Sequence, residues 1–449
     1  MYINRVGDAD NPRFEDPSQS NICRHSVKSH VEELAIFGGP PVFPYKLHVG
    51  RPNIGDRSAL LSRINDILDR RWLTNDGPYL KEFEKRICEV SDVKHCVAVC
   101  NATIGLEIVA KAIGLSGEVI LPSFTFIATA HALRWLGITP IFCDVDSATH
   151  NIDPLRAEEL ITARTSGIIG VHLWGRPCNA DALVDLARRH KLTILFDAAH
   201  AFACSYKRRM IGGFGDAEIF SFHATKFVNT FEGGAVVTNS DELAAKLRLV
   251  RNFGFAGFDR VTSLGTNAKM AEVAAAMGLT SFESLDKFVA ANYQNYKGYR
   301  LHLADVSGIS MMTYEERQKY NYQYIVVEID EDRLGVTRDQ LDDILWAENV
   351  LSRRYFYPGC HRMEPYRTTD PKAGLRLPQT ERLARRVLCL PTGSTIGSGE
   401  ITAICELFEF VAEHAEAVRQ RLLTKRICRH RPRTPLQQVP SIRSKPKVS

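Results

Sequence analysis

Lys226 is the residue with the clearest chemical potential, because it lies in a loop between two predicted strands. An alternating apolar run ends near Ser221, a single lysine follows, and Gly233-Gly234 leads into a second β-rich run. A lysine in a short, mostly apolar loop is partly desolvated, which disfavours the ammonium form and leaves the free amine that Schiff-base chemistry needs. The same stretch also fits a solvated surface lysine, which is the commoner case.

A carboxylate, Asp197, comes where the predicted strand Thr193–Phe196 should end. Ligands of open α/β sheets bind at the carboxyl ends of strands, and a carboxylate there can hold a proton on the ring nitrogen of pyridoxal phosphate. Asp197 alone fits a helix cap or a turn residue equally well. Asp197 and Lys226 on neighbouring strand ends together favour a cofactor site.

From residue 95 onward, predicted strands and helices alternate, which indicates a mostly parallel, doubly wound sheet. The turn Asn101-Ala102-Thr103 joins a strand over 95–100 to an apolar-periodic helix over 104–113. Unsatisfied N–H groups and the dipole at a helix N-terminus favour an anion, so this turn can seat a phosphate. Asn101 acting simply as an N-cap is the alternative.

Three motifs in order resemble the DegT/DnrJ/EryC1/StrS family of pyridoxal-phosphate sugar aminotransferases, over about residues 35–420: Asp197-Ala-Ala-His200, Ser221-Phe-His-Ala-Thr-Lys226 and Glu232-Gly-Gly. The resemblance implies the fold type I of aminotransferases. That is an α/β fold with a mostly parallel central sheet in a large domain and a smaller C-terminal α/β domain. It also implies pyridoxal 5'-phosphate bound covalently to Lys226, with Asp197 at the ring nitrogen.

The resemblance assigns further cofactor contacts. It places the phosphate on Ala102 and Thr103, with the Ser221 hydroxyl as an additional donor. Phe126 follows a strand that stops at Pro122, and the resemblance makes it the residue that stacks on the cofactor ring. From the residues alone, an aromatic at a strand end is more often part of the core.

Two other contacts follow from the resemblance. His200 lies just past Asp197 and is expected to hydrogen-bond the phenolic oxygen of the cofactor, where many relatives carry glutamine. The family pattern Gly-x-Asn-x-Lys matches Gly265, Asn267 and Lys269, and in relatives the asparagine reaches the phosphate bound by the neighbouring subunit. The resemblance therefore implies a homodimer with shared active sites.

The sequences of Ser221–Gly234 and Arg353–His361 resemble those of the family branch that aminates C4 of dTDP-4-keto-6-deoxyglucose. We therefore expect a nucleotide-sugar aminotransferase of deoxyaminosugar biosynthesis, with L-glutamate as the donor and a nucleotide ketosugar as the acceptor. A 3-keto or a GDP- or UDP-linked acceptor, or a non-catalytic regulator that binds the cofactor, are the alternatives. Arg353, Arg354, Tyr355 and His361 fall on the expected substrate side, although a solvated basic strand is also possible.

The length of 449 residues favours a large domain plus a smaller one. We predict a polar N-terminal extension over 1–34, a cofactor-binding domain over 35–289, a small domain over 290–424 and a basic, disordered tail over 425–449. The net charge of +5 is misleading, because the tail holds eight basic residues and no acid, while the remainder carries 49 basic and 52 acidic residues. Since the tail lacks interleaved aromatics, we expect no nucleic-acid partner.

The eleven cysteines are odd in number and scattered, without Cys-x-x-Cys or Cys/His ligand spacing. Free thiols in a reducing compartment are therefore expected rather than disulfides, and no metal site is expected. The N-terminus lacks a hydrophobic signal core, and no run of 18 apolar residues occurs. These features predict a cytoplasmic protein without a membrane partner.

Overall fold

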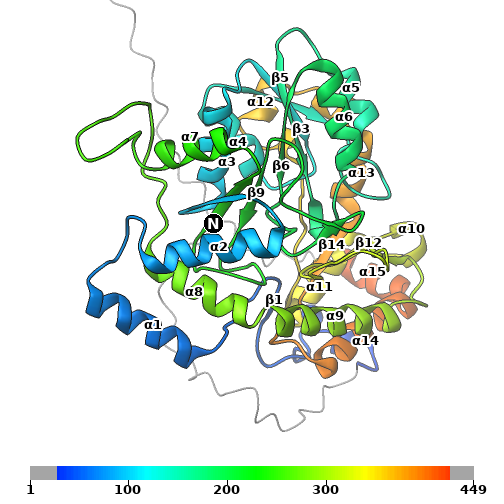
Figure 1. Cartoon of the computed structure of the whole chain (residues 1–449). Coiled ribbons are helices and arrows are strands. Elements are labelled where there is room, and N and C mark those ends of the chain that lie inside the picture. The colour runs from blue at the N-terminus through cyan, green and yellow to red at the C-terminus, as the bar shows by residue number, and fades with distance from the viewer. Residues whose placement is uncertain (1–27, 425–449) are drawn as a thin grey trace, which may run out of the picture.

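The computed structural model describes residues 28–424 (Figure 1). Within them, one sheet has seven strands in the order β2-β10-β9-β6-β5-β3-β4. β10 is antiparallel to β2 and β9, and the other neighbours in this sheet are parallel, which confirms the predicted mostly parallel α/β sheet. The strands are β2 (His95–Val99), β3 (Glu118–Pro122), β4 (Thr139–Cys143), β5 (Thr165–Val171), β6 (Thr193–Asp197), β9 (Ala217–Ser221) and β10 (Gly234–Thr238).

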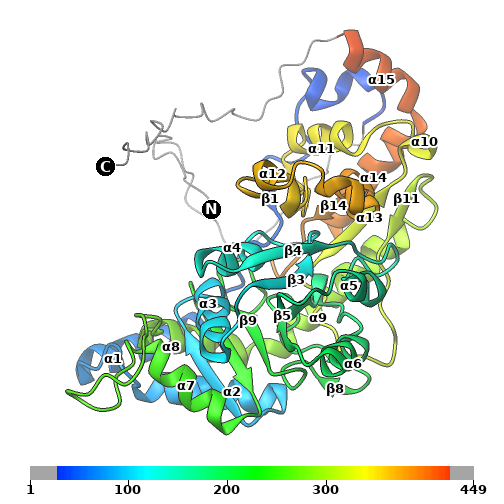
Figure 2. The same cartoon turned by 90° about the horizontal axis from the view of Figure 1, so that it is seen from above.

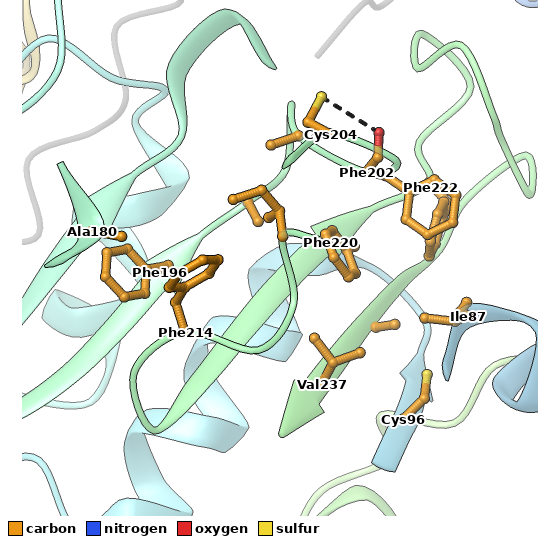
Figure 3. Close-up of a cluster of buried hydrophobic side chains, with 14 of the residues drawn as sticks. Ile87, Cys96, Ala180, Phe196, Phe202, Cys204, Phe214, Phe220, Phe222 and Val237 are labelled. Carbon is orange, nitrogen blue, oxygen red and sulfur yellow. Dashed lines mark hydrogen bonds between the residues drawn. The ribbon is translucent and has the colours of Figure 1, made fainter. Parts of the chain in front are cut away.

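Helices cover both faces of this sheet. Successive side chains of each strand point to opposite faces, and apolar side chains on both faces pack into hydrophobic cores under the helices. Phe196 and Phe220 pack into one core together with α2, α6 and α8, and Figure 3 shows both rings with Phe222 and Val237. Their sequence neighbours Leu195 and Ile219 pack into the other core, together with α3, α4 and α7. The helices of the large unit are α1 (Arg57–Arg70), α2 (Pro78–Ser91), α3 (Ala102–Ile113), α4 (Ala128–Trp135), α5 (Pro154–Glu159), α6 (Ala180–His190), α7 (Asp241–Arg251) and α8 (Glu272–Glu283).

A second, smaller unit is built on the antiparallel strands β11 (Ile309–Met311), β12 (Ile325–Ile329) and β14 (Val387–Leu390). Figure 2 shows this unit, in yellow to red, beside the large one. A third hydrophobic core fills it and includes Ile325, Leu341 and Phe408. Its main helices are α9 (Leu285–His302), α11 (Arg338–Ala347), α13 (Pro378–Arg386), α14 (Ser398–Glu413) and α15 (Ala415–Thr424).

The first described residues pack on the C-terminal unit and not on the central sheet. Val31, Leu34 and Phe43 belong to the core of the small unit, and the blue segment in Figure 2 lies beside α11 and α15. The buried Glu348 carboxylate accepts hydrogen bonds from backbone N–H groups of this segment and lies 3.3 Å from the Lys28 amine. Residues 28–34 are thus packed, unlike the predicted loose extension, whereas residues 1–27 and the predicted tail over 425–449 lie outside the described residues.

The apolar spacing from Lys269 onward predicts a helix that starts at Lys269, and the spacing over 400–421 predicts one amphipathic helix. Both predicted boundaries are wrong. Lys269 does not open a helix: it bridges to Val99 in an extended segment, and α8 begins only at Glu272, whose carboxylate accepts the N–H groups of Tyr79 and Leu80. The predicted helix over 400–421 is two helices, α14 and α15, which meet at His414. In the part of the chain that the structure describes, no helix is both long and apolar enough to cross a membrane.

Candidate active site

The candidate site lies where β6 and β9 end side by side. Asp197 is the last residue of β6 and Ser221 is the last of β9, and the two strands are parallel neighbours. Asp197 follows Leu195 by two residues, and Ser221 likewise follows Ile219. Because the side-chain period of a strand is two, both side chains point to the face of the sheet that α3 covers.

Asp197 is buried, with 6% of its surface exposed. Its carboxylate accepts a hydrogen bond from Thr129 Oγ1 at 2.8 Å and another from the Ala199 N–H at 3.1 Å. Burial raises the pKa of Asp197, while these two donors and the nearby Lys226 act in the opposite direction. The two hydrogen bonds fix the carboxylate in one orientation at the strand end, with its charge facing the space above the sheet.

Lys226 lies in the loop between β9 and β10, as predicted. The loop is folded back on itself, since Thr230 N–H donates to Phe222 O and Asn53 Nδ2 donates to Phe227 O. The amine of Lys226 donates a hydrogen bond to the hydroxyl of Tyr324, with 3.1 Å between the two atoms. Desolvation lowers the pKa of Lys226 to about 8, and the charge of Asp197 limits the shift, so a share of free amine exists near neutral pH.

The predicted phosphate seat is assembled by strand pairing. Gly234 lies opposite both Ser221 and Val99, and a Cβ atom on Gly234 would lie 2.6 Å from the Ala102 nitrogen. The missing side chain thus lets the strand approach the N-terminus of α3. Asn101 Oδ1 caps this helix by accepting the Ile104 N–H at 2.9 Å.

The two sequence interpretations of this turn, a helix cap and a phosphate seat, are compatible with each other. The cap engages the N–H of Ile104, which leaves those of Ala102 and Thr103 to face an anion. Ser221 is half-buried at the end of the neighbouring strand and offers a hydroxyl to the same space. The three predicted phosphate contacts therefore lie around one small cradle.

His200 is 7% exposed and lies beside the rings of Trp174 and Phe356, which stack on each other with centroids 5.2 Å apart. Its ring is nearly parallel to those of Trp174 and Phe356, with centroids at 6.1 and 6.0 Å. Nδ1 accepts the backbone N–H of Trp174 at 3.3 Å, and burial keeps the pKa of His200 well below its ordinary value. The neutral ring therefore carries its proton on Nε2, which makes that nitrogen a donor.

Phe126 lies at the start of α4 with 52% of its surface exposed, so it is not the core residue that strand-end aromatics usually are. Its backbone carbonyl accepts a hydrogen bond from Thr129 Oγ1 at 3.1 Å, the same hydroxyl that holds Asp197. Its ring meets the edge of Phe356 at 6.3 Å. An apolar ring surface is thus available beside Asp197, as stacking requires.

Asn267 is the one predicted cofactor residue that does not join this group within the subunit. It is exposed, and its backbone pairs with Asn252. The amine of Lys269 donates to the Asn252 side chain at 3.0 Å, and the pair lines an open pocket together with Arg248 and Arg251. A role for Asn267 at the cofactor therefore depends on a second subunit.

The residues expected on the substrate side are mostly engaged with protein partners. Arg354 donates to Asp339 at 2.8 Å, and its guanidinium lies over the ring of Tyr357. His361 is buried and its two ring nitrogens contact Ser123 Oγ and Glu381 Oε1, each at 2.7 Å. His361 thus joins the small unit to Ser123 of the large one, whereas Arg354 stabilises the small unit through Asp339. Neither is a solvated basic residue.

Thr129 and Tyr324 are the residues at the site that sequence reasoning did not single out. Thr129 orients Asp197, and Tyr324 contacts the amine of Lys226. Tyr324 precedes β12 in the small unit, 98 residues after Lys226. The spacing of residues within one segment cannot predict a contact between such distant positions.

Among residues 28–424, no cluster of three or more His, Cys, Asp or Glu could hold a metal ion.

Comparison with known proteins identifies the family of the chain. A family model for the DegT/DnrJ/EryC1/StrS aminotransferase family matches residues 56–409. The dTDP-4-amino-4,6-dideoxy-D-glucose transaminase of Shigella dysenteriae is 36% identical over 352 residues, which cover 78% of this chain and 95% of that protein. The GDP-perosamine synthase of Caulobacter vibrioides is 37% identical over 306 residues, covering 67% and 82%.

Among solved structures, DesI in the presence of its TDP-sugar product is 49% identical, with a TM-score of 0.83, and the match covers 87% of this chain and 99% of DesI. The fold and the site thus define an aminotransferase of fold type I. The chain belongs to the DegT/DnrJ/EryC1/StrS aminotransferase family, whose aminotransferases depend on pyridoxal phosphate.

The residues of this chain fit that cofactor. The N–H groups of Ala102 and Thr103 at the N-terminus of α3, which the Asn101 cap does not engage, suit a phosphate. Lys226 supplies an amine of lowered pKa, and the buried Asp197 supplies a carboxylate for a protonated ring nitrogen.

Proposed function

We propose that the protein is a nucleotide-sugar aminotransferase that moves the amino group of L-glutamate to C4 of dTDP-4-keto-6-deoxyglucose. The observation that carries the chemistry is the placement of Asp197 at the end of β6 and of Lys226 in the loop after the neighbouring parallel strand β9. The acceptor is supported by the names of the relatives, a dTDP-4-amino-4,6-dideoxy-D-glucose transaminase and DesI with its TDP-sugar product.

In this proposal each residue has one task. Pyridoxal 5'-phosphate, bound through Lys226, supplies an electron sink for the carbon that loses a proton. The amine of Lys226, once released, takes the proton from the α-carbon of glutamate and delivers it to C4′ of the cofactor, and it performs the reverse transfer on the sugar. Asp197 holds a proton on the ring nitrogen, and Nε2 of His200 donates to the phenolic oxygen. Phe126 stacks on the ring, while Ala102, Thr103 and Ser221 bind the phosphate.

The alternatives differ in what they require of the same site. A sugar 3-dehydratase of this fold would be expected to carry histidine at the position of Lys226, and the lysine present here argues against it. A GDP-linked acceptor has support of its own, because the GDP-perosamine synthase of Caulobacter vibrioides is also a relative. A 3-keto or UDP-linked sugar, and a regulator that binds the cofactor without turnover, are the remaining alternatives.

The acceptor is tested by incubating the enzyme, cofactor and glutamate with each nucleotide ketosugar separately and locating the new amine by NMR. We expect transfer to dTDP-4-keto-6-deoxyglucose, with a kcat/KM at least about tenfold above that for a GDP or 3-keto sugar, a difference of about 1.4 kcal/mol. Preference for another acceptor would overturn the substrate assignment alone. Transfer to none of them, with cofactor bound, would favour the regulator.

We also propose a homodimer in which Asn267 reaches the cofactor phosphate of the partner. The segment that carries Asn267 exposes large apolar side chains, which a monomer rarely does in one place. They are Phe253, Phe255, Phe258, Val261 and Leu264, with exposed fractions from 39% to 99%. Asn267 itself is exposed on the same segment, as a contact to another subunit requires.

The shared site predicts complementation between two defective variants, Lys226→Ala and Asn267→Asp. A mixed dimer combines an intact Lys226 from one protomer with an intact Asn267 from the other, so one of its two sites is complete. Random reassortment should therefore restore about a quarter of wild-type activity. Sedimentation should give twice the chain mass. A monomer, or a mixture no more active than the mean of its parts, would contradict the proposal.

A cytoplasmic location remains part of the proposal. It is supported by the nine cysteines in the described residues, which are all free thiols, and seven of them are buried.

A further inference from the structure

Tyr324 is the hydrogen-bonding partner of the Lys226 amine in the described residues. The distance from Nζ to the Tyr324 hydroxyl is 3.1 Å, and the amine also lies 5.7 Å from the centre of the tyrosine ring. Lys226 belongs to the large unit and Tyr324 to the small one, directly before β12. This contact therefore ties the reactive lysine to the position of the other unit.

The surroundings of Tyr324 fix the place of its hydroxyl. The residue is 7% exposed, and its ring lies 4.5 Å from that of His200 and 5.5 Å from that of Trp174. Its backbone carbonyl accepts a long hydrogen bond from the Tyr314 hydroxyl at 3.4 Å. A ring packed on several sides has few alternative rotamers, so its hydroxyl is a preorganised partner.

A tyrosine hydroxyl suits a lysine that changes protonation state during a reaction. Burial raises the pKa of Tyr324 well above its ordinary value, so the hydroxyl stays neutral. It can accept a hydrogen bond from an ammonium group, and it can donate one to the lone pair of a free amine. Lysine has a long side chain with high rotamer entropy, which makes such a fixed partner valuable once the amine is released.

We propose that Tyr324 is a positioning residue that holds the amine of Lys226 in place between its proton transfers. The inference rests on the function proposed above and adds a residue to it. Besides Tyr324, Asp197 acts electrostatically on Lys226, while the charge of Lys226 acts on His200 and His223, and a change at Tyr324 leaves all three groups in place. The effect of losing the hydroxyl is therefore separable from the effect of losing a charge.

Tyr324→Phe removes only the hydroxyl. We expect kcat to fall about 10- to 100-fold, because a misplaced catalytic group lowers the rate by this order, while the KM for glutamate changes by no more than about twofold. Tyr299→Phe is the matched control, since Tyr299 is another buried tyrosine of the small unit and its hydroxyl donates to Pro391 O at 2.9 Å, away from Lys226. The control should keep the wild-type kcat.

A second readout uses the protein without cofactor. Trace labelling of Lys226 by an amine-reactive reagent, measured by mass spectrometry across a pH series, gives the titration midpoint of the amine. Loss of an acceptor for the ammonium form should lower the midpoint in Tyr324→Phe by at least about half a unit, and Tyr299→Phe should leave it unchanged. Circular dichroism checks that Tyr324→Phe keeps the fold, which is the expected result because phenylalanine retains the ring contacts with His200 and Trp174.

The outcomes separate the inference from the function on which it rests. A wild-type enzyme that transfers no amine to any ketosugar overturns the proposed function, whatever the midpoints are. A wild-type enzyme that turns over, together with a Tyr324 variant that keeps its kcat within about threefold and its midpoint unshifted, overturns the role of Tyr324 alone.

Discussion

Lys226→Ala is expected to lower the rate of multiple turnover by at least about 1,000-fold while the protein stays folded. The expected loss is large because the amine both binds the cofactor covalently and moves the proton in each half of the reaction, and a positioned acid or base alone contributes about 100- to 10,000-fold. Folding should survive, since the loop is held by its own backbone hydrogen bonds and by Asn53, not by the lysine amine.

The measurement is steady-state transfer from glutamate to the ketosugar, with unfolding followed by circular dichroism. Lys246→Ala is the control, because Lys246 is an exposed lysine on α7 that pairs with Glu242 at 2.7 Å, remote from the strand ends. A second readout is covalent retention of the cofactor after borohydride reduction, which Lys226→Ala should abolish and Lys246→Ala should not. A purified Lys226→Ala enzyme that makes multiple turnovers would refute the assignment.

The parts of the site that the sequence predicted are those set by local pattern. Lys226 and Asp197 follow strands that the apolar alternation identifies, and the chain order of a doubly wound sheet brings such strand ends together. The seat around Ala102 was predictable for the same reason, because a strand that meets a helix N-terminus is visible in a short window. The structure adds the reason for Gly234, whose missing side chain allows the close approach.

The parts that sequence reasoning missed depend on contacts between distant segments. Tyr324 reaches Lys226 only because the small unit packs against the large one, and the packing of residues 31–47 on the small unit depends on a buried carboxylate, Glu348, far along the chain. His361 was placed on the substrate side by its motif, but its two ring nitrogens are occupied by Ser123 and Glu381. Residue type and spacing indicate chemistry, whereas the partner of a polar side chain is decided by tertiary packing.

Asp197→Asn should leave the fold intact and slow the half-reaction with glutamate by about 100- to 1,000-fold, because it removes the charge that stabilises a protonated ring nitrogen. The substitution nearly preserves shape. The amide oxygen of asparagine can still accept the Ala199 N–H, and the Thr129 hydroxyl already has a second acceptor, the Phe126 carbonyl. Stopped-flow absorbance of the cofactor after mixing with glutamate measures this rate directly.

Thr129→Val is the matched variant, since it keeps the charge of Asp197 and removes the hydroxyl whose hydrogen bond at 2.8 Å orients the carboxylate. Its half-reaction should slow by about tenfold, much less than that of Asp197→Asn.

The pH dependence of the half-reaction rate separates the two variants further. Burial raises the pKa of Asp197, so the wild-type rate should decline as the pH falls through that raised value, when the carboxylate takes up a proton and loses its charge. Thr129→Val should keep this acid limb and move it to higher pH, because one donor that favours the charged form is gone, whereas Asp197→Asn has no carboxylate to titrate and should lack the limb. A rate for Asp197→Asn within a few-fold of wild type, with the acid limb still present, would show that another group holds the ring proton.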